Sequence, residues 1–389
     1  MRKLGALLGL VVVFMTAPAL AGDAEIAALK AVLAPGPAEA GLFNGAFLKA
    51  VPPDKLQAVV EPIKTQIGPV VAVEARGGQT YAVETATYEM IADIVLDADG
   101  KIAGLLFHAP VQKNASLDDL LQQMAAAAPQ SAYVVLKDGK PIAASTPDKA
   151  LAVGSAFKLG VLKALKDDID SGAREWSDVV MLKAEDMSLP SGMLQTWPVG
   201  SPLTLHTLAT LIISISDNTA ADMLLKLVGR DRVEAALGIS LALTTRELFI
   251  LKANRELLSR YVAADAEGAR KVLVEVDALP LPDVSKIMTP FTPGAEWHVS
   301  PNKLCALMAE VAGLDVTQVN PGVVPKTDWG SVSFKGGSEV GVLSLVTQAR
   351  GKDGATYCVA ATWNAPQALD EGKAETAYAG VLGKLARGG

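Results

Sequence analysis

A serine and a lysine stand three residues apart at the start of an apolar helical stretch, at Ser155 and Lys158. Serine becomes a good nucleophile only when a base takes its proton. Residues three apart lie on one face of a helix, so Oγ of Ser155 and Nζ of Lys158 can come within hydrogen-bond reach. Burial and the positive end of the helix dipole both disfavour an ammonium, so both lower the lysine pKa. The spacing predicts a serine nucleophile with a lysine base, and the Ser155 amide at the helix start can donate to an oxyanion.

This spacing alone is a weak signal, because Ser300 and Lys303 repeat it. There the structural interpretation is better: Ser300 caps a helix and Pro301 is its first residue. Taken by itself, Ser155 has the same alternative interpretation as a helix N-cap. The two other polar motifs that accompany it decide in favour of chemistry.

The first of these motifs is Ser216-Asp217-Asn218, which begins 61 residues after Ser155 and lies between two apolar helical runs. A hydroxyl at Ser216 can relay a proton between Lys158 and a leaving group. The Asn218 amide can hold a carbonyl of the substrate. The alternative is that Ser216 or Asp217 merely caps a helix.

The second motif is the strand end that runs from Ser333 to Ser338, with Lys335 standing 180 residues after Ser155. Lys335 supplies a fixed cation, and the two glycines that follow it let a ligand approach the backbone closely. The Ser338 amide can be a second oxyanion donor, and its hydroxyl can contact a carboxylate. The alternative is an ordinary strand end that its glycines weaken.

Together the three motifs resemble the serine β-lactamase and penicillin-binding superfamily, whose signatures are S-x-x-K, S-D-N and K-T-G in that order. The resemblance is to the class A-like members and covers residues 116–389. It implies that Ser155 is the acylated nucleophile, Lys158 its base and Ser216 the proton relay. It also implies that Asn218 and Lys335 hold the substrate amide and carboxylate, with the Ser155 and Ser338 amides as the oxyanion hole.

Two features depart from the family pattern. The third motif reads Lys-Gly-Gly, so the threonine that helps hold the carboxylate is missing, and Ser338 is its candidate substitute. Class A enzymes release the acyl group with a glutamate in an E-x-x-L-N loop, and this sequence has no such loop. The one glutamate we nominate is Glu247. Its alternative is a local ion pair with an arginine such as Arg246.

The order of the helices and strands that must position these residues predicts an α/β (α+β) chain of two domains. A small α+β domain occupies 22–109, with helices over 23–33 and 53–66 and a strand pair around an Asp-Gly turn at 97–100. Residues 110–115 form a linker. The hydrolase domain, 116–389, is expected to have a class A-like mixed sheet built from both ends of the segment, with helices on both faces. The leading domain resembles a steroid isomerase, as in clavulanic-acid-cluster esterase-like proteins.

Composition narrows the classes of partner. A basic start, the apolar run from Leu4 to Met15 and an A-x-A site predict a signal peptide over 1–21, cut before Gly22. The mature chain is then periplasmic or secreted, without a stable membrane anchor. A formal charge of −7 with no basic run disfavours nucleic acid as a partner.

The histidines and cysteines bear on metals and disulfides. Three histidines that form no pair disfavour a zinc site, so we expect no metal and no cofactor. The only cysteines, Cys305 and Cys358, either form a disulfide or remain buried thiols.

These observations favour an exported serine hydrolase that opens β-lactams through an acyl-enzyme on Ser155. Two alternatives stay open. One is an esterase or peptidase with weak β-lactamase activity, and the other is a penicillin-binding sensor that stays acylated. In each case the partner is a small acyl substrate, and substrate range depends on loops outside the motifs.

Overall fold

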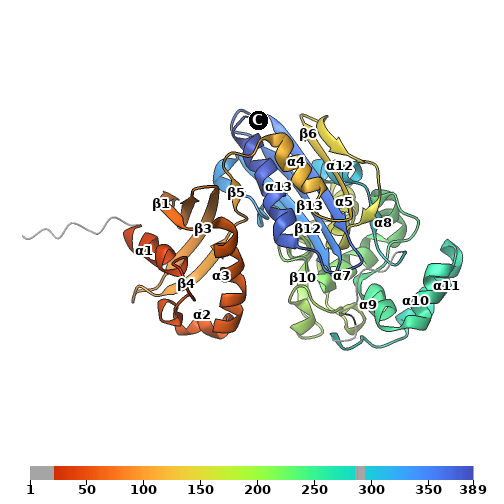
Figure 1. Ribbon diagram of the computed structural model, residues 1–389. Coiled ribbons are helices and arrows are strands. Elements are labelled where there is room, and N and C mark those ends of the chain that lie inside the picture. The colour runs from red at the N-terminus through yellow and green to blue at the C-terminus, as the bar shows by residue number, and fades with distance from the viewer. Residues whose placement is uncertain (1–21, 285–286, 288–293, 389) are drawn as a thin grey trace, which may run out of the picture. The chain divides into compact units, whose positions relative to one another are not determined.

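The computed structural model describes residues 22–284, 287 and 294–388, and its chain divides into two compact units, 1–107 and 108–389 (Figure 1). The predicted signal peptide lies outside the described residues. Within those residues, no helix combines the length and the apolar composition that crossing a membrane requires.

The first unit places three helices before an antiparallel meander of four strands. A turn at Asp97 joins the last two strands, as the Asp-Gly signal predicted, and its carboxylate accepts hydrogen bonds from the amides of Asp99 and Lys101. The likeness of this unit to a steroid isomerase stays a prediction. The elements are α1 (Asp23–Val32), α2 (Gly45–Ala50), α3 (Pro53–Ile67), β1 (Val70–Gly77), β2 (Thr80–Thr85), β3 (Tyr88–Leu96) and β4 (Ile102–Phe107).

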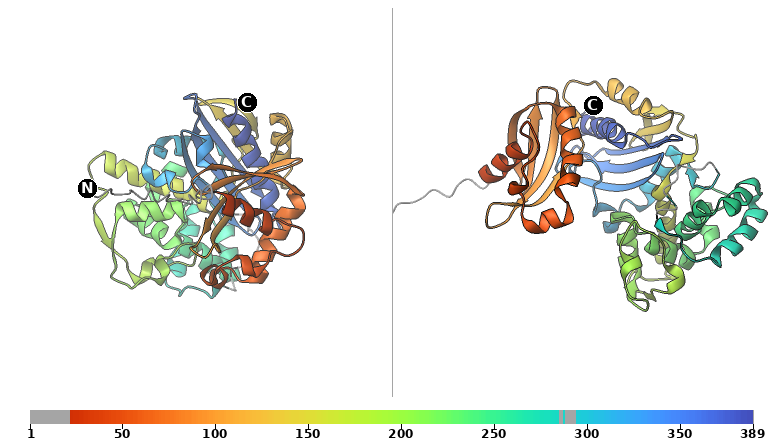
Figure 2. Two further views of the ribbon diagram at one scale, coloured as in Figure 1. Left: turned by 90° about the vertical axis from the view of Figure 1, so that its left-hand side faces the viewer. Right: turned by 60° about the horizontal axis from the view of Figure 1, so that its bottom comes forward.

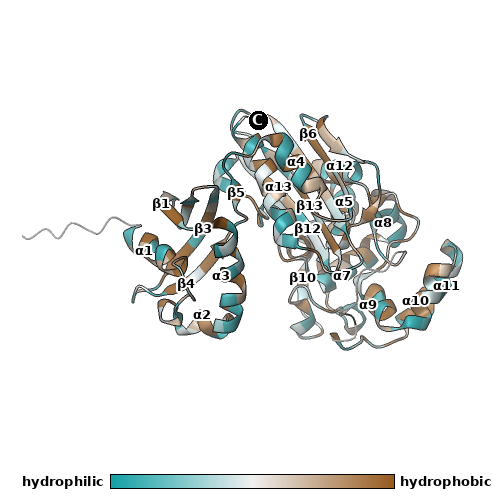
Figure 3. Ribbon diagram, in the orientation of Figure 1, coloured by the Kyte–Doolittle hydropathy of each residue, from teal (hydrophilic) through white to brown (hydrophobic). Residues whose placement is uncertain are grey.

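One apolar face of this meander packs against the helices. Tyr81 and Val83 alternate along β2 and meet Val32 of α1 and Val60 of α3 in a shared core. Figure 3 shows β3 and β4 mostly in the hydrophobic colour, whereas α3 carries both colours. The pattern is that of a helix with one packed face.

The second unit is built on a five-stranded sheet with the order β12-β13-β14-β6-β7. The sheet draws strands from both ends of the segment, as expected. All four pairings in it are antiparallel. The reason is that short turns connect β6 to β7, β12 to β13 and β13 to β14, and short turns join antiparallel neighbours. The strands are β6 (Gln130–Lys137), β7 (Lys140–Ser145), β12 (Ser331–Glu339), β13 (Val342–Arg350) and β14 (Thr356–Asn364).

Helices cover both faces of this sheet, as predicted (Figures 1 and 2). Val135 and Val359 point to the face that carries α4 and α13, while Val134 and Ala360 point to the opposite face. The period-two alternation of strands explains why neighbours such as Val134 and Val135 enter different cores. The four helices are α4 (Leu117–Ala125) and α13 (Glu371–Ala386) on one face, and α5 (Lys158–Asp170) and α12 (Pro301–Val311) on the other.

A helical region follows α5. A two-stranded ribbon, β9 with β10, interrupts its helices. A short strand also lies within the predicted linker. The remaining elements are β5 (Val111–Gln112), β8 (Leu151–Ala152), β9 (Val179–Met181), β10 (Pro202–Thr204), α6 (Leu205–Ser214), α7 (Asn218–Val228), α8 (Arg230–Leu237), α9 (Thr245–Ala253), α10 (Arg255–Ala263), α11 (Ala266–Asp277) and β11 (His298–Val299).

The two cysteines form a disulfide, which answers the question that the sequence left open. Cys305 of α12 and Cys358 of β14 have an S–S distance of 2.02 Å and a Cα–Cα distance of 6.0 Å. The bond joins a helix to the sheet that it covers, across a sequence separation of 53 residues. In the chain-entropy model a loop of that length stabilises the folded state by about 4 kcal/mol.

Candidate active site

Ser155 and Lys158 lie side by side where the chain enters α5. Ser155 belongs to a 3₁₀ turn, η2 (Gly154–Phe157), and Lys158 is the first residue of α5. Residues three apart eclipse one another in a 3₁₀ turn, so the two side chains project together. Nζ of Lys158 lies 3.0 Å from Oγ of Ser155. Ser155 caps no helix, whereas Ser300 accepts a hydrogen bond from the Lys303 amide at 3.3 Å, as the N-cap interpretation predicted.

The Lys158 ammonium is fully buried and is surrounded by the second motif. Its Nζ lies 2.6 Å from the Ser216 carbonyl oxygen, 3.2 Å from Oγ of Ser216 and 2.6 Å from Oδ1 of Asn218. Burial lowers the pKa of Lys158 well below its ordinary value, and the nearby charge of Lys335 lowers it further. A lysine in this environment can be a neutral base.

Ser216 lies between two lysines. Its Oγ also accepts a hydrogen bond from Nζ of Lys335 at 3.0 Å. Its backbone has φ of 57°, a left-handed conformation that is uncommon for a serine and is found at functional sites. Lys335 is buried, and burial lowers its pKa to about 7. The three motifs therefore form one hydrogen-bonded chain from Ser155 through Lys158 and Ser216 to Lys335.

Asp217 fixes the turn that presents Ser216. Its carboxylate accepts hydrogen bonds from the amides of Met193, Leu194 and Ala220, and the last of these caps α7. Gly192 has φ of +97°, and a Cβ there would lie 2.3 Å from the Asp217 carboxyl carbon, so only glycine fits. The capping interpretation thus holds for Asp217, while Ser216 is left to face the two lysines.

The strand end of the third motif comes very close to the backbone at Ser155. A Cβ on Gly337 would lie 2.5 Å from the Ser155 amide nitrogen and 2.2 Å from the Val153 carbonyl oxygen. Gly154 faces the Ser338 amide nitrogen, 3.4 Å from its own Cβ position. Glycine at 337 is therefore what brings the Ser155 and Ser338 amides to the same place, as an oxyanion hole requires.

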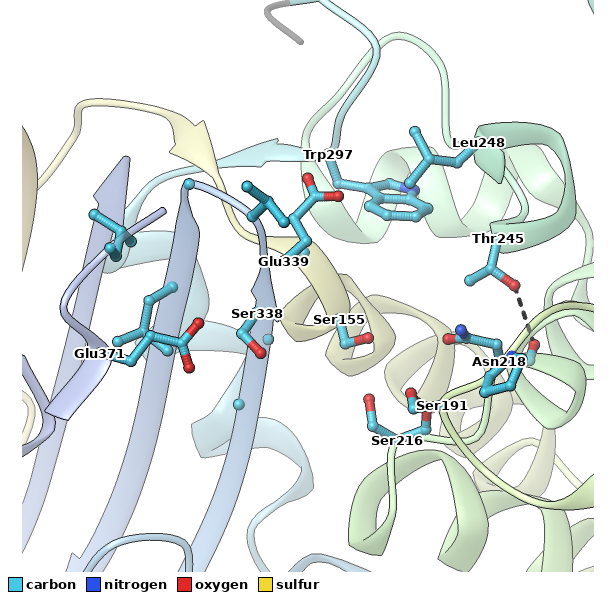
Figure 4. Close-up of a pocket in the computed structure, with 18 of the residues that line it drawn as sticks. Ser155, Ser191, Ser216, Asn218, Thr245, Leu248, Trp297, Ser338, Glu339 and Glu371 are labelled. Carbon is cyan, nitrogen blue, oxygen red and sulfur yellow. Dashed lines mark hydrogen bonds between the residues drawn. The ribbon is translucent and has the colours of Figure 1, made fainter. Parts of the chain in front are cut away.

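These groups open onto a cavity of about 720 Å³ in the second unit (Figure 4). Lys158 and Lys335 do not line it and lie behind the wall that Ser155, Ser216 and Ser338 present. Figure 4 shows Ser155 between Ser338 on the strand side and Ser216 with Asn218 on the helical side. Nδ2 of Asn218 donates to the Leu189 carbonyl at 3.0 Å, so the amide is held from both ends.

The structure does not place Glu247, the nominated releasing base, at the cavity. Its carboxylate pairs with Arg230 at 2.6 Å and accepts a hydrogen bond from the Thr244 amide at 2.6 Å. The partner is Arg230 and not Arg246, which donates to two backbone carbonyls instead. The reason is local: Glu247 is the third residue of α9 and closes a capping box, which directs its side chain back along the helix.

Sequence reasoning missed several residues of the cavity. Ser191 donates to the Ser216 carbonyl at 2.7 Å, and Trp297 stacks on Phe157 with ring centroids 3.9 Å apart. Lys252 and Glu339 also line it and pair with each other. The directly adjacent Ser338 was the only signal for Glu339. Among the described residues, no group of three His, Cys, Asp or Glu side chains is placed to hold a metal ion.

Comparison with known proteins agrees with this fold. Residues 112–311 match the model of the beta-lactamase enzyme family. A β-lactamase from Sphaerobacter thermophilus is 22% identical, with 70% of this chain and 95% of that chain covered and a TM-score of 0.50. An ancestral class A β-lactamase is 18% identical, with 70% and 99% covered and a TM-score of 0.50. No curated protein matches the sequence.

The fold of the second unit is that of a serine hydrolase of the α+β class, with helices on both faces of one antiparallel sheet. The chain belongs to the β-lactamase enzyme family.

Proposed function

We propose that this chain is an exported serine hydrolase that opens β-lactams through an acyl-enzyme on Ser155 and then hydrolyses that intermediate. The observation that carries the proposal is the position of Lys158 Nζ, buried and 3.0 Å from Oγ of Ser155. The predicted signal peptide places the mature chain in a periplasm or outside the cell. Destruction of β-lactam antibiotics there would give resistance.

In the attack step, neutral Lys158 accepts the Ser155 hydroxyl proton while Oγ forms a bond to the acyl carbon. The carbonyl electron pair moves onto oxygen, where the amides of Ser155 and Ser338 stabilise it. Collapse breaks the carbon–nitrogen bond of the ring. The proton returns from Lys158 through the Ser216 hydroxyl, 3.2 Å away, to the leaving nitrogen.

Substrate contacts follow from the same arrangement. The Asn218 amide holds the side-chain carbonyl of the substrate, and Lys335 supplies positive potential for its carboxylate. The Ser338 hydroxyl lines the cavity and is the polar contact that replaces the missing threonine. At Gly336, where the family has threonine, a Cβ would lie 3.0 Å from the Phe334 ring. A larger residue there requires that ring to move.

One observation favours the two alternative functions. These are a sensor that keeps the acyl group on Ser155 and an esterase for which simple esters are better substrates than β-lactams. The observation is the commitment of Glu247 to Arg230, which leaves α9 without a free glutamate at the cavity. Lys335 points the same way, since its ammonium already donates to Ser216 and to the Gly336 carbonyl. Both features weaken β-lactam turnover more than they weaken attack by Ser155.

One experiment separates these readings. The protein is incubated with a penicillin, and its intact mass and the released product are followed over time. Rapid release with a transient adduct supports the β-lactamase, and a persistent adduct supports a sensor. Ester cleavage without either supports an esterase. The control is Ser155→Ala, which must abolish adduct and turnover; full activity in this variant rejects the proposal.

A further inference from the structure

A buried charge cluster joins three walls of the cavity. Lys252, near the end of α9, places its Nζ 2.6 Å from Oε1 of Glu296 and in contact with Oε2 of Glu339. The side chains of Lys252 and Glu296 are 1% and 0% exposed. Lys252 and Glu339 line the same cavity as Ser155.

The cluster holds two carboxyl groups and one ammonium. Oε2 of Glu296 and Oε1 of Glu339 are buried and, among the described residues, receive no hydrogen bond. One proton shared between the two carboxyl groups supplies the missing donor and makes the cluster neutral. Burial, and then the neighbouring Glu339, raises the pKa of Glu296 well above its ordinary value, in agreement with that proton.

The two glutamates of the cluster lie on segments that adjoin or contact the acylation site. Glu339 is the last residue of β12 and directly follows Ser338, whose amide is the second oxyanion donor. Glu296 directly precedes Trp297, whose carbonyl accepts a hydrogen bond from the Val153 amide at 3.0 Å. The Trp297 indole also stacks on Phe157, between Ser155 and Lys158 in the sequence. Lys252 therefore connects the backbone segments that carry both oxyanion donors.

We propose that Lys252, Glu296 and Glu339 are positioning residues whose ion pairs fix the Ser338 amide relative to Ser155 in the oxyanion hole. The inference rests on the proposed function. The carboxyl groups act through the backbone, since their oxygens face Lys252 or are buried. Figure 4 shows the Glu339 carboxylate turned toward Trp297 and away from the Ser155 hydroxyl.

The test uses the full chain and a matched pair of substrates, an ester and the thionoester with the same acyl and leaving groups. A thiocarbonyl sulfur accepts hydrogen bonds poorly, so the ester-to-thionoester ratio of acylation rates reports on the oxyanion donors. Glu339→Ala is expected to lower acylation by the ester, and with it this ratio, by about 10- to 100-fold, because a displaced donor loses most of its effect. A general defect lowers both rates equally.

Two variants serve as controls. Glu339→Gln keeps an acceptor for Lys252 and gives Glu296 an N–H donor, so its ratio should stay within about threefold of wild type. Glu371→Ala removes another carboxylate of the same cavity, one without an ion pair in the described residues, and should leave the ratio unchanged. If Glu339→Ala does not fold, Glu339→Asp takes its place; its carboxylate is one methylene shorter, and the same fall in the ratio, smaller in size, is expected.

An unchanged ratio in Glu339→Ala or, if that variant does not fold, in Glu339→Asp overturns the inference, and so does an equal fall in Glu371→Ala. These results are distinct from failure of the proposed function, in which wild-type protein itself acquires no adduct at Ser155.

Discussion

The charged side chains at two walls of one cavity differ in whether they have a partner of opposite charge. On the wall formed by η2, α5 and β12, two buried lysines face serine hydroxyls, and no carboxylate pairs with either Lys158 or Lys335 among the described residues. On the wall formed by α9, every charge has a partner: Glu247 pairs with Arg230, and Lys252 with two glutamates. The buried carboxylate of Asp222 accepts hydrogen bonds from the backbone amides of Thr245 and Arg246, at the start of α9.

This difference distinguishes residues that take part in the reaction from residues that hold the site in place. An unpaired buried lysine is costly as a cation and so is held near neutrality, the state in which it accepts a proton. A charged side chain that is held by its partners fixes geometry. We therefore expect substitutions on the first wall to change reaction rates, and those on the α9 wall to change stability or the placement of β12.

The largest expected effect comes from Lys158→Met, which removes the base and retains the volume of the side chain. Acylation of Ser155 should slow by about 10³-fold, within the range for loss of a general base. Stopped-flow release of a chromogenic leaving group measures it. Lys303→Met, at the same spacing from Ser300, is the matched control and should leave the rate unchanged. Equal rates in Lys158→Met and wild type would place the base elsewhere.

Ser216→Ala should produce the next largest effect, about a 10²-fold fall in kcat, because it breaks the hydrogen-bonded chain between Lys158 and Lys335. Single-turnover acylation should fall with it. Ser214→Ala removes a hydroxyl that donates to the Thr210 carbonyl within α6, and it provides the comparison. If the Ser216 variant keeps wild-type kcat, the relay role is excluded.

A tenfold change in KM is expected when the pH changes. Lys335 is a cation whose pKa is lowered to about 7, so it is charged below that value and neutral above it. The KM of a carboxylate-bearing substrate should rise about tenfold between pH 6 and pH 8, as the protonated fraction falls. A neutral ester should show no such rise. Parallel curves for the two substrates would mean that the charge of Lys335 does not act on the carboxylate.

The smallest effect on activity is expected at Glu247. Glu247→Gln should leave the adduct lifetime unchanged but lower the free energy of unfolding by about 2–4 kcal/mol, since it leaves partly buried Arg230 without its counter-charge. Denaturant unfolding measures the latter. Glu310→Gln, which breaks the exposed pair with Lys163, should cost less than about 1 kcal/mol. A lengthened adduct lifetime in Glu247→Gln would restore that residue as a releasing base.

Local patterns predicted most of the fold. The Asp-Gly signal at 97–100 placed the hairpin of β3 and β4, where Gly100 adopts a φ of 73°. The predicted α12 cap at Ser300 is also confirmed. The order of the strands in the second sheet had no local signal, since pairing partners depend on contacts between distant segments.

The contacts of the candidate site likewise fall into those that follow from local sequence and those that depend on the fold. Ser155 and Lys158 are three residues apart, so their contact follows from helix geometry alone. The meeting of Glu339 with Lys252, 87 residues away, has no local signal. The partner of Glu247 likewise required the fold, because Arg230 and Arg246 are both near in sequence and only packing chooses between them.

The most direct test of the account is the protonation state of Lys158. Lysine side chains labelled with ¹³C at Cε are followed by NMR across pH, with Lys158→Met used to assign the resonance. The account predicts that Lys158 titrates well below the ordinary lysine range and is neutral where the enzyme acylates. A Lys158 that stays protonated up to about pH 10, the value of a free lysine, would contradict it.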